Sequence, residues 1–152
     1  LHILVQMRET EGEKLAADLR ERLRYLQKLH NEIEDSSVNM VSLYREKLKS
    51  RIAEILDNGQ IDENRLALEV ALFADKSSIT EELVRLKSHF QQFGQTLQDN
   101  QPVGRKLDFL LQEMHREVNT IASKTSDLSI TQHVVEMKSE LEKLREQVQN
   151  IE

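Results

Sequence analysis

Residues 78–97 read SITEELVRLKSHFQQFGQTL, and this stretch decides the fold class. Its large apolar side chains recur at steps of four and three, at Ile79, Leu83, Leu86, Phe90, Phe93 and Leu97. Such a heptad seam predicts an α-helix that packs side by side with another helix. Ser78 and Glu81 have the spacing of a capping box, which predicts that this helix begins at Ser78.

The same apolar spacing continues on both sides of this stretch. It predicts further helices over residues 1–34, 38–56, 62–76, 104–123 and 128–152. The expected breaks are Asp35-Ser36-Ser37, Asp57-Asn58-Gly59, Asp99-Asn100-Gln101-Pro102 and Lys124-Thr125-Ser126-Asp127. Asp62 is a good N-cap, and Gly59 suits the left-handed position after a helix. Because no period-two alternation is sustained, the predicted fold is all-α, an elongated helical bundle or set of helical hairpins without a sheet.

Composition narrows the classes of function. The 152 residues contain no Cys, which excludes disulfides, thiolate metal sites and cysteine nucleophiles. The net charge of −6 opposes nucleic-acid binding unless Lys and Arg gather locally or are supplied by another domain. No apolar run approaches the roughly 20 residues of a membrane span. We therefore expect no membrane partner, and a cytoplasmic location fits.

One polar cluster borders the seam of residues 78–97. Glu82, Arg85 and His89 are three and four residues apart, so they share one face of the predicted helix, and Glu81 lies beside them. A carboxylate next to an imidazole suits general acid–base work on a ribose hydroxyl, since imidazole titrates near neutral pH. A solvated stripe of ion pairs with an ordinary surface histidine explains the same spacing.

A second polar cluster lies on the helix predicted over residues 104–123. Its members are Asp108, Gln112, Glu113, Arg116, Glu117, Asn119 and, just beyond, Lys124. Glu113 and Glu117 are one turn apart, so their oxygens could share a divalent cation. Salt bridging on a helix surface is the alternative. The two clusters should meet, because a short loop favours antiparallel neighbours, and His89 is then expected about level with Glu113.

Several ordered motifs resemble the YicC/YloC family of bacterial proteins. They are MRETEG (7–12), LEVALFADK (68–76), ITEELVRLKSH (79–89), GRKLDFLLQEM (104–114), REVNTIASK (116–124) and EKLREQVQNIE (142–152). The resemblance covers essentially the whole chain. It implies the helical C-terminal half of a divalent-metal-dependent endoribonuclease that acts on RNA and forms ring-like homo-oligomers such as hexamers, with its N-terminal domain absent here. Residues 1–60 would then be a long helical hairpin continuing the joining helix, and residues 61–152 the C-terminal helical domain.

Residue roles follow as hypotheses, because both polar clusters fall inside the matched motifs. We assign catalysis to His89, Glu82 and Glu117, RNA contacts to Arg85, Arg116, Asn119 and Lys124, and a divalent metal ion to Glu113 and Glu117. The alternative is an oligomerisation or scaffold module whose chemistry resides in the absent domain. Self-association is also expected, because a single small domain is not expected to bury the seams of both 78–97 and 128–152.

Overall fold

The computed structural model describes residues 2–56, 60–99 and 103–151. These ranges hold six helices: α1 (His2–Val38), α2 (Met40–Ile55), α3 (Glu63–Ser77), α4 (Thr80–Thr96), α5 (Gly104–Lys124) and α6 (Leu128–Val148). The same ranges contain no strand, which confirms the predicted all-α fold. None of the six helices combines the length and apolar character that a membrane span requires.

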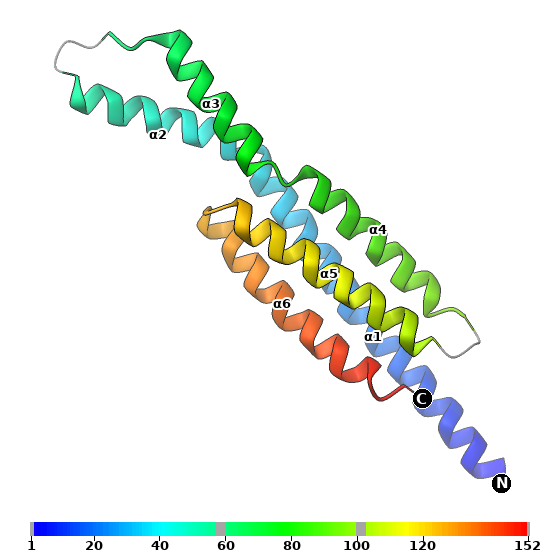
Figure 1. Ribbon diagram of the computed structural model, residues 1–152. Coiled ribbons are helices and arrows are strands. Elements are labelled where there is room, and N and C mark those ends of the chain that lie inside the picture. Colours follow the sequence, from blue (N-terminus) through cyan, green and yellow to red (C-terminus); the bar gives the residue numbers. More distant parts are fainter. Residues whose placement is uncertain (1, 57–59, 100–102, 152) are drawn as a thin grey trace.

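Four helices close into a bundle, and the other two form a hairpin at one end of it (Figure 1). α1 and α5 each pack against both α4 and α6, so every helix of the bundle has two helical neighbours. α2 and α3 pack against each other, and α2 also contacts α1. The molecule is therefore elongated, with the α2–α3 hairpin continuing the line of the bundle.

The apolar seams predicted from the sequence meet inside this bundle. The buried side chains of α4, α5 and α6 include Leu83, Leu86, Phe90, Phe93, Leu107, Leu110, Met114, Val118, Val134, Met137, Leu141 and Leu144. Burial of each large apolar side chain stabilises the fold by about 1.5–3 kcal/mol relative to exposure. Because one chain buries the seams of both α4 and α6, the reason given above for self-association is wrong.

Histidine also takes part in the core. His30 of α1 is 3% exposed, and its Nε2 lies 2.7 Å from the carbonyl oxygen of Leu83 in α4. Since a carbonyl only accepts, this contact needs the tautomer that carries a proton on Nε2. The His30 ring also meets Phe90 edge to face, with the ring centroids 6.0 Å apart. His30 thus joins α1 to α4.

The first helix is longer than predicted, because Asp35-Ser36-Ser37 lies inside α1. The Ser37 hydroxyl donates to the carbonyl oxygen of Glu34 at 2.7 Å, within the helix. Ile33 and Met40 are buried in the same core on either side of this segment. Their packing outweighs the weak helix preference of Asp and Ser, so the predicted break is wrong, and the interruption between α1 and α2 falls at Asn39.

Two predicted helix starts have opposite outcomes. The Asp62 carboxylate accepts from the backbone N–H groups of Asn64 and Arg65 at 3.1 and 3.3 Å, which confirms this N-cap. The capping box at Ser78 is wrong, because α4 has Ile79 as its N-cap residue and no side-chain cap bond. Ile79 is 2% exposed, and its anchoring in the core sets the start of α4 one residue later. The segments predicted at 57–59 and 100–102 lie outside the described residues.

Candidate functional site

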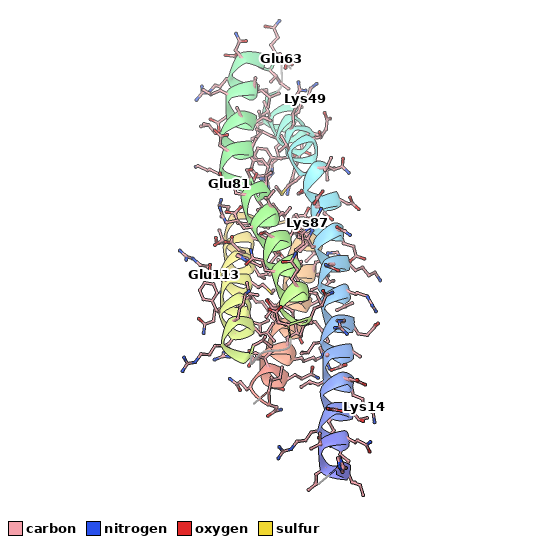
Figure 2. The ribbon with its side chains drawn as sticks, turned by 90° about the vertical axis from the view of Figure 1, so that its right-hand side faces the viewer. Lys14, Lys49, Glu63, Glu81, Lys87 and Glu113 are labelled. Atoms are coloured by element: carbon pink, nitrogen blue, oxygen red, sulfur yellow. The ribbon has the colours of Figure 1, made fainter. Side chains whose placement is uncertain are left out.

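The two polar clusters meet where α4 and α5 run side by side. The guanidinium Nε of Arg85 donates to Glu117 Oε1 at 2.9 Å, so these residues face each other across the helix pair. The two helices run antiparallel, so the residue four positions after Arg85 on α4 is level with the residue four positions before Glu117 on α5. These residues are His89 and Glu113. Figure 2 shows Glu81 and Glu113 on these two neighbouring helices. The predicted packing of the two helices is confirmed.

Five of these side chains form one continuous network, the α4–α5 ion-pair cluster: Glu81, Glu82, Arg85, Glu117 and Lys124. Lys124 Nζ donates to Glu82 Oε1 at 2.7 Å. Arg85 is 3.6 Å from Glu82 and 3.4 Å from Glu81, in addition to its bond with Glu117. Glu82 and Glu117 are 2% and 6% exposed, so the two buried carboxylates depend on these cations.

Electrostatics keep Glu82 ionised. Burial by itself raises the pKa of the Glu82 carboxyl. The hydrogen bond from Lys124, a backbone hydrogen bond and the positive charges of Lys124 and Arg85 together outweigh burial, so the pKa lies below its ordinary value. The hydrogen bond to Glu117 raises the pKa of Arg85. Glu82 therefore acts as a fixed negative charge near neutral pH and is not a proton donor there.

Two buried polar atoms near this cluster lack a hydrogen-bond partner among the described residues. They are Oε2 of Glu82 and Nδ1 of His89. Buried polar groups in native proteins are nearly always paired, so each exception needs an explanation such as a water, an ion or a catalytic role. Both atoms belong to α4, on residues two turns apart, so they lie on the same helix as Arg85 and on either side of it.

The remaining predicted site residues are more scattered. Glu113 is half-buried and Arg116 is exposed, and neither side chain has a hydrogen bond or ion pair within the described ranges. Asn119 lies in a different recess, between α5 and α6, which it shares with His115 and Arg145. Burial lowers the pKa of His115 in that recess. The structure thus brings Glu82, Arg85, Glu117 and Lys124 together, and it places Asn119 on another face of α5.

The described residues do not fit a resident divalent ion. No group of three or more His, Asp or Glu side chains in these ranges could hold a metal. Glu117 already accepts from Arg85, and Glu113 adds one more carboxylate one turn away. Divalent cations such as Mg²⁺ and Ca²⁺ take at least six oxygen ligands. A cation here would therefore need most of its ligands from water, RNA or protein outside this segment.

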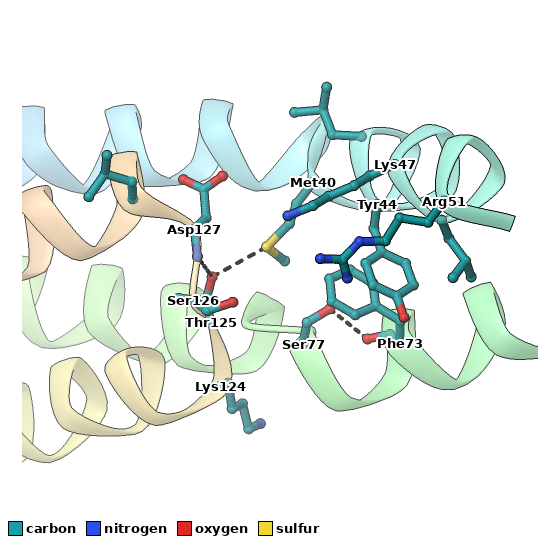
Figure 3. A pocket seen from close by; sticks show the side chains of 13 residues that line it. Met40, Tyr44, Lys47, Arg51, Phe73, Ser77, Lys124, Thr125, Ser126 and Asp127 are labelled. Carbon is teal, nitrogen blue, oxygen red and sulfur yellow. Dashed lines mark hydrogen bonds between the residues drawn. The ribbon is translucent and has the colours of Figure 1, made fainter. Parts of the chain in front are cut away.

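Sequence reasoning missed a cavity at the junction of the hairpin with the bundle (Figure 3). This junction cavity lies between α2, the end of α3 and the α5–α6 connection, and its lining includes Lys47, Arg51 and Lys124. A signal was present, since residues 45–51 of the sequence, REKLKSR, carry four basic residues and one acidic residue. The closeness of this segment to Lys124 follows only from the tertiary fold.

Comparison with known proteins places these features in context. Residues 33–152 match the family described as "Endoribonuclease YicC-like, C-terminal". The chain is 59% identical over 150 residues to a Clostridioides difficile protein named "Probable endoribonuclease YicC". The aligned residues cover 98% of the chain and 51% of that relative. A Haemophilus influenzae protein of the same name is 36% identical over 148 residues, covering 97% of the chain and 51% of the relative. The chain spans about half the length of these curated relatives.

Proposed function

Since the chain belongs to the YicC-like endoribonuclease family, we propose that it serves as the C-terminal half of an enzyme that cleaves RNA phosphodiester bonds. The observation that carries this proposal is the family match over residues 33–152. Two relatives named as probable endoribonucleases support it. The chain corresponds to their C-terminal half, so the other half of the enzyme is expected to contribute to substrate binding or chemistry.

The α4–α5 ion-pair cluster is the best candidate within this half for a contact with RNA. It holds three carboxylates against two cations, so it carries a net negative charge. Arg85 is about half exposed and Lys124 about one-third exposed, which lets both cations reach a phosphate oxygen. A divalent cation, which the family resemblance implies, would offset the excess negative charge when RNA is bound.

His89 is the side chain proposed to move a proton. Its Nδ1 is buried, so Nε2 is the nitrogen that would meet a ribose 2′ hydroxyl. An imidazole placed there could accept the hydroxyl proton as the 2′ oxygen attacks the phosphorus and the bond from phosphorus to the 5′ oxygen breaks, with the leaving 5′ oxygen taking a proton from water. Glu82 and Glu117 are held by Arg85 and Lys124, so they fit positioning roles better than proton donation.

A second function, as an oligomerisation or scaffold module, is favoured by one observation. The α2–α3 hairpin projects from the bundle (Figure 1), and its exposed large apolar side chains are Leu43, Ile55, Leu56, Leu68 and Leu72. These side chains are 43–79% exposed. If these side chains form one continuous patch, they could serve as a contact with another protein surface, such as a second copy of the chain.

The test of the proposed function compares three purified proteins on a labelled single-stranded RNA. They are residues 1–152 alone, the full-length Clostridioides difficile relative, and a chimaera in which residues 1–152 replace the matching half of that relative. Each is assayed with Mg²⁺, with Mn²⁺ and with a chelator. We expect metal-dependent cleavage by the relative and the chimaera, and weak or no cleavage by residues 1–152.

Two variants of the chimaera separate catalysis from folding. His89→Gln should lose most of the cleavage, while His133→Gln, whose ring contacts Glu32 of α1 away from the α4–α5 ion-pair cluster, should keep it. Absence of cleavage by both the relative and the chimaera would refute the function. Full activity of residues 1–152 alone would refute the need for the other half, and an active His89→Gln chimaera would remove His89 from the mechanism in favour of the scaffold function.

A further inference from the structure

The junction cavity is lined by two cations, Lys47 and Arg51, that form no ion pair with the described residues. Its volume is about 450 Å³, within the range of small-ligand pockets. Figure 3 shows Lys47 and Arg51 reaching over it from α2, with the α5–α6 connection opposite them. The cavity therefore lies between the α2–α3 hairpin and the four-helix bundle, where an extended ligand lying across the junction would contact both.

The cations that line the junction cavity are available to a ligand. Lys47 and Arg51 are exposed, and neither forms an ion pair with a carboxylate of the described residues. Asp127 also lines the cavity, but its carboxylate accepts from the backbone N–H of Ile130 at 3.0 Å as the N-cap of α6. The local excess of positive charge contrasts with the net charge of −6 of the whole chain, so this cavity meets the requirement for a local basic surface.

The wall of the cavity is partly apolar, and two of its hydroxyl groups are hydrogen-bonded within the chain. The Tyr44 and Phe73 rings are stacked, with centroids 3.8 Å apart and planes 7° apart. The Ser77 hydroxyl donates to the Phe73 carbonyl oxygen at 2.6 Å, and the Thr125 hydroxyl is directed to Met40 Sδ at 3.4 Å. These inner groups are already paired. A ligand would therefore find exposed cations at the mouth and an apolar floor, which suits a sugar-phosphate unit better than a free ion.

Lys124 connects this cavity to the α4–α5 ion-pair cluster. Its stem lines the cavity, while its Nζ donates to Glu82 on α4. A strand held by Lys47 and Arg51 would thus run toward Glu82 and Arg85. The side chain of Lys124 has enough freedom, at 35% exposure, to be shared between the carboxylate and a phosphate.

We propose that the junction cavity binds the phosphate backbone of single-stranded RNA and leads it to the α4–α5 ion-pair cluster. This inference rests on the proposed function, and it names the residues that hold the substrate. Lys47 and Arg51 are the principal contacts, because the forked guanidinium of Arg51 can bind two phosphate oxygens and Lys47 adds a mobile point charge. A single strand is specified because a sugar-phosphate unit enters a recess more readily when it is not held in a duplex.

The test measures binding of a labelled single-stranded RNA to residues 1–152 by fluorescence anisotropy over a range of salt concentrations. The variant is Lys47→Ala with Arg51→Ala. The matched control is Lys14→Ala with Lys49→Ala, which removes the same charge. Figure 2 places Lys14 at the far end of the molecule from the hairpin, and Lys49 is an exposed residue of α2 that does not line the cavity. Thermal melts check that all variants fold.

Each phosphate contact with a single strand contributes about 0.7 to the magnitude of the slope of the logarithm of the binding constant against the logarithm of the salt concentration. The variant loses two such contacts, so the magnitude of its slope should be about 1.4 smaller than that of the parent chain. At about 0.1 M salt this corresponds to binding about 25-fold weaker than that of the parent chain. The control should change the slope by less than about half of that amount. Millimolar inorganic phosphate should compete only weakly, since a free ion lacks the sugar contacts.

The outcomes distinguish this inference from the proposed function. If the parent and variant bind RNA equally, or the control weakens binding as much as the variant, the cavity is not the RNA site, while cleavage by the chimaera can still stand. Absence of RNA binding by the parent chain also overturns the inference. If inorganic phosphate or double-stranded RNA binds as well as the single strand, the assignment of the ligand is wrong even though the cations are correct.

Discussion

The pair formed by Glu82 and Lys124 offers the sharpest energetic test of the α4–α5 ion-pair cluster. In the Lys124→Met variant, the Glu82 carboxylate stays 2% exposed, with Arg85 at 3.6 Å as its nearest remaining cation. Removing one partner of a fully buried pair costs about 3–5 kcal/mol. Because Lys124 is about one-third exposed and Arg85 remains, we expect a loss of about 2 kcal/mol in the free energy of unfolding. For a chain of this size that corresponds to a fall in Tm of about 4–8 °C.

The matched variants are Glu82→Met and the double variant Glu82→Met with Lys124→Met. Glu82→Met should cost less than Lys124→Met, because the Lys124 ammonium can turn to water. The double variant should be within about 1 kcal/mol of the parent chain, since a buried ion pair replaced by apolar side chains is often close to neutral. Urea unfolding of all four proteins, followed by circular dichroism, gives the coupling energy from a double-mutant cycle.

A loss below about 0.5 kcal/mol for Lys124→Met, with no coupling in the cycle, would show that the pair is not formed as described. The same double variant, placed in the chimaera, separates the two proposed functions. If the cluster positions RNA, the double variant is stable but cleaves poorly. If the cluster only holds α4 to α5, the double variant cleaves as well as the parent chimaera.

Three further predictions concern acid stability, the core and association. The pKa of Glu82 lies below its ordinary value of 4.5, so the ionised carboxylate contributes its full stabilisation above pH 4.5 and loses it as the pH falls through the lowered pKa. The difference in free energy of unfolding between the parent chain and Glu82→Gln should therefore narrow below pH 4.5, as measured by urea titrations. Phe90→Ala should lose about 3–5 kcal/mol in the same assay, whereas Phe109→Ala, 59% exposed, should lose less than about 0.5 kcal/mol. Light scattering should show an oligomer that Ile55→Lys with Leu68→Lys dissociates without lowering Tm; a parent chain that is monomeric at high concentration would contradict this.

Much of the fold could be read from local patterns. The seam of residues 78–97 predicts its helix because apolar spacing of three and four has one simple solution. The spacing of the seams on either side of a short loop also predicted that α4 and α5 lie side by side, and the bond between Arg85 and Glu117 follows from that register. The N-cap at Asp62 was equally local, since its carboxylate bonds to backbone groups two and three residues away.

Other features depended on neighbours distant in sequence. Asp35-Ser36-Ser37 lies within a helix because Ile33 and Met40 are anchored in a shared core, and the start of α4 is shifted from Ser78 by the burial of Ile79. Intrinsic preferences differ by less than about 1 kcal/mol per residue, so packing energies of a few kcal/mol override them. Helix boundaries that depend on packing between distant segments cannot be predicted from local residue spacing.

Local patterns in the sequence were enough to predict the helices, their apolar faces and the resemblance to an endoribonuclease family, because each of these depends on residues that lie close together along the chain. The packing of the helices in three dimensions was needed to show that the seams of α4 and α6 are both buried in one bundle, and that Lys47 and Arg51 of α2 share a cavity with Lys124 at the end of α5. It also placed Asn119 of α5 in a recess with Arg145 of α6. The physical reason is that a helix face acquires its neighbours from the way the helices pack, and the free energy of that packing is summed over the whole core.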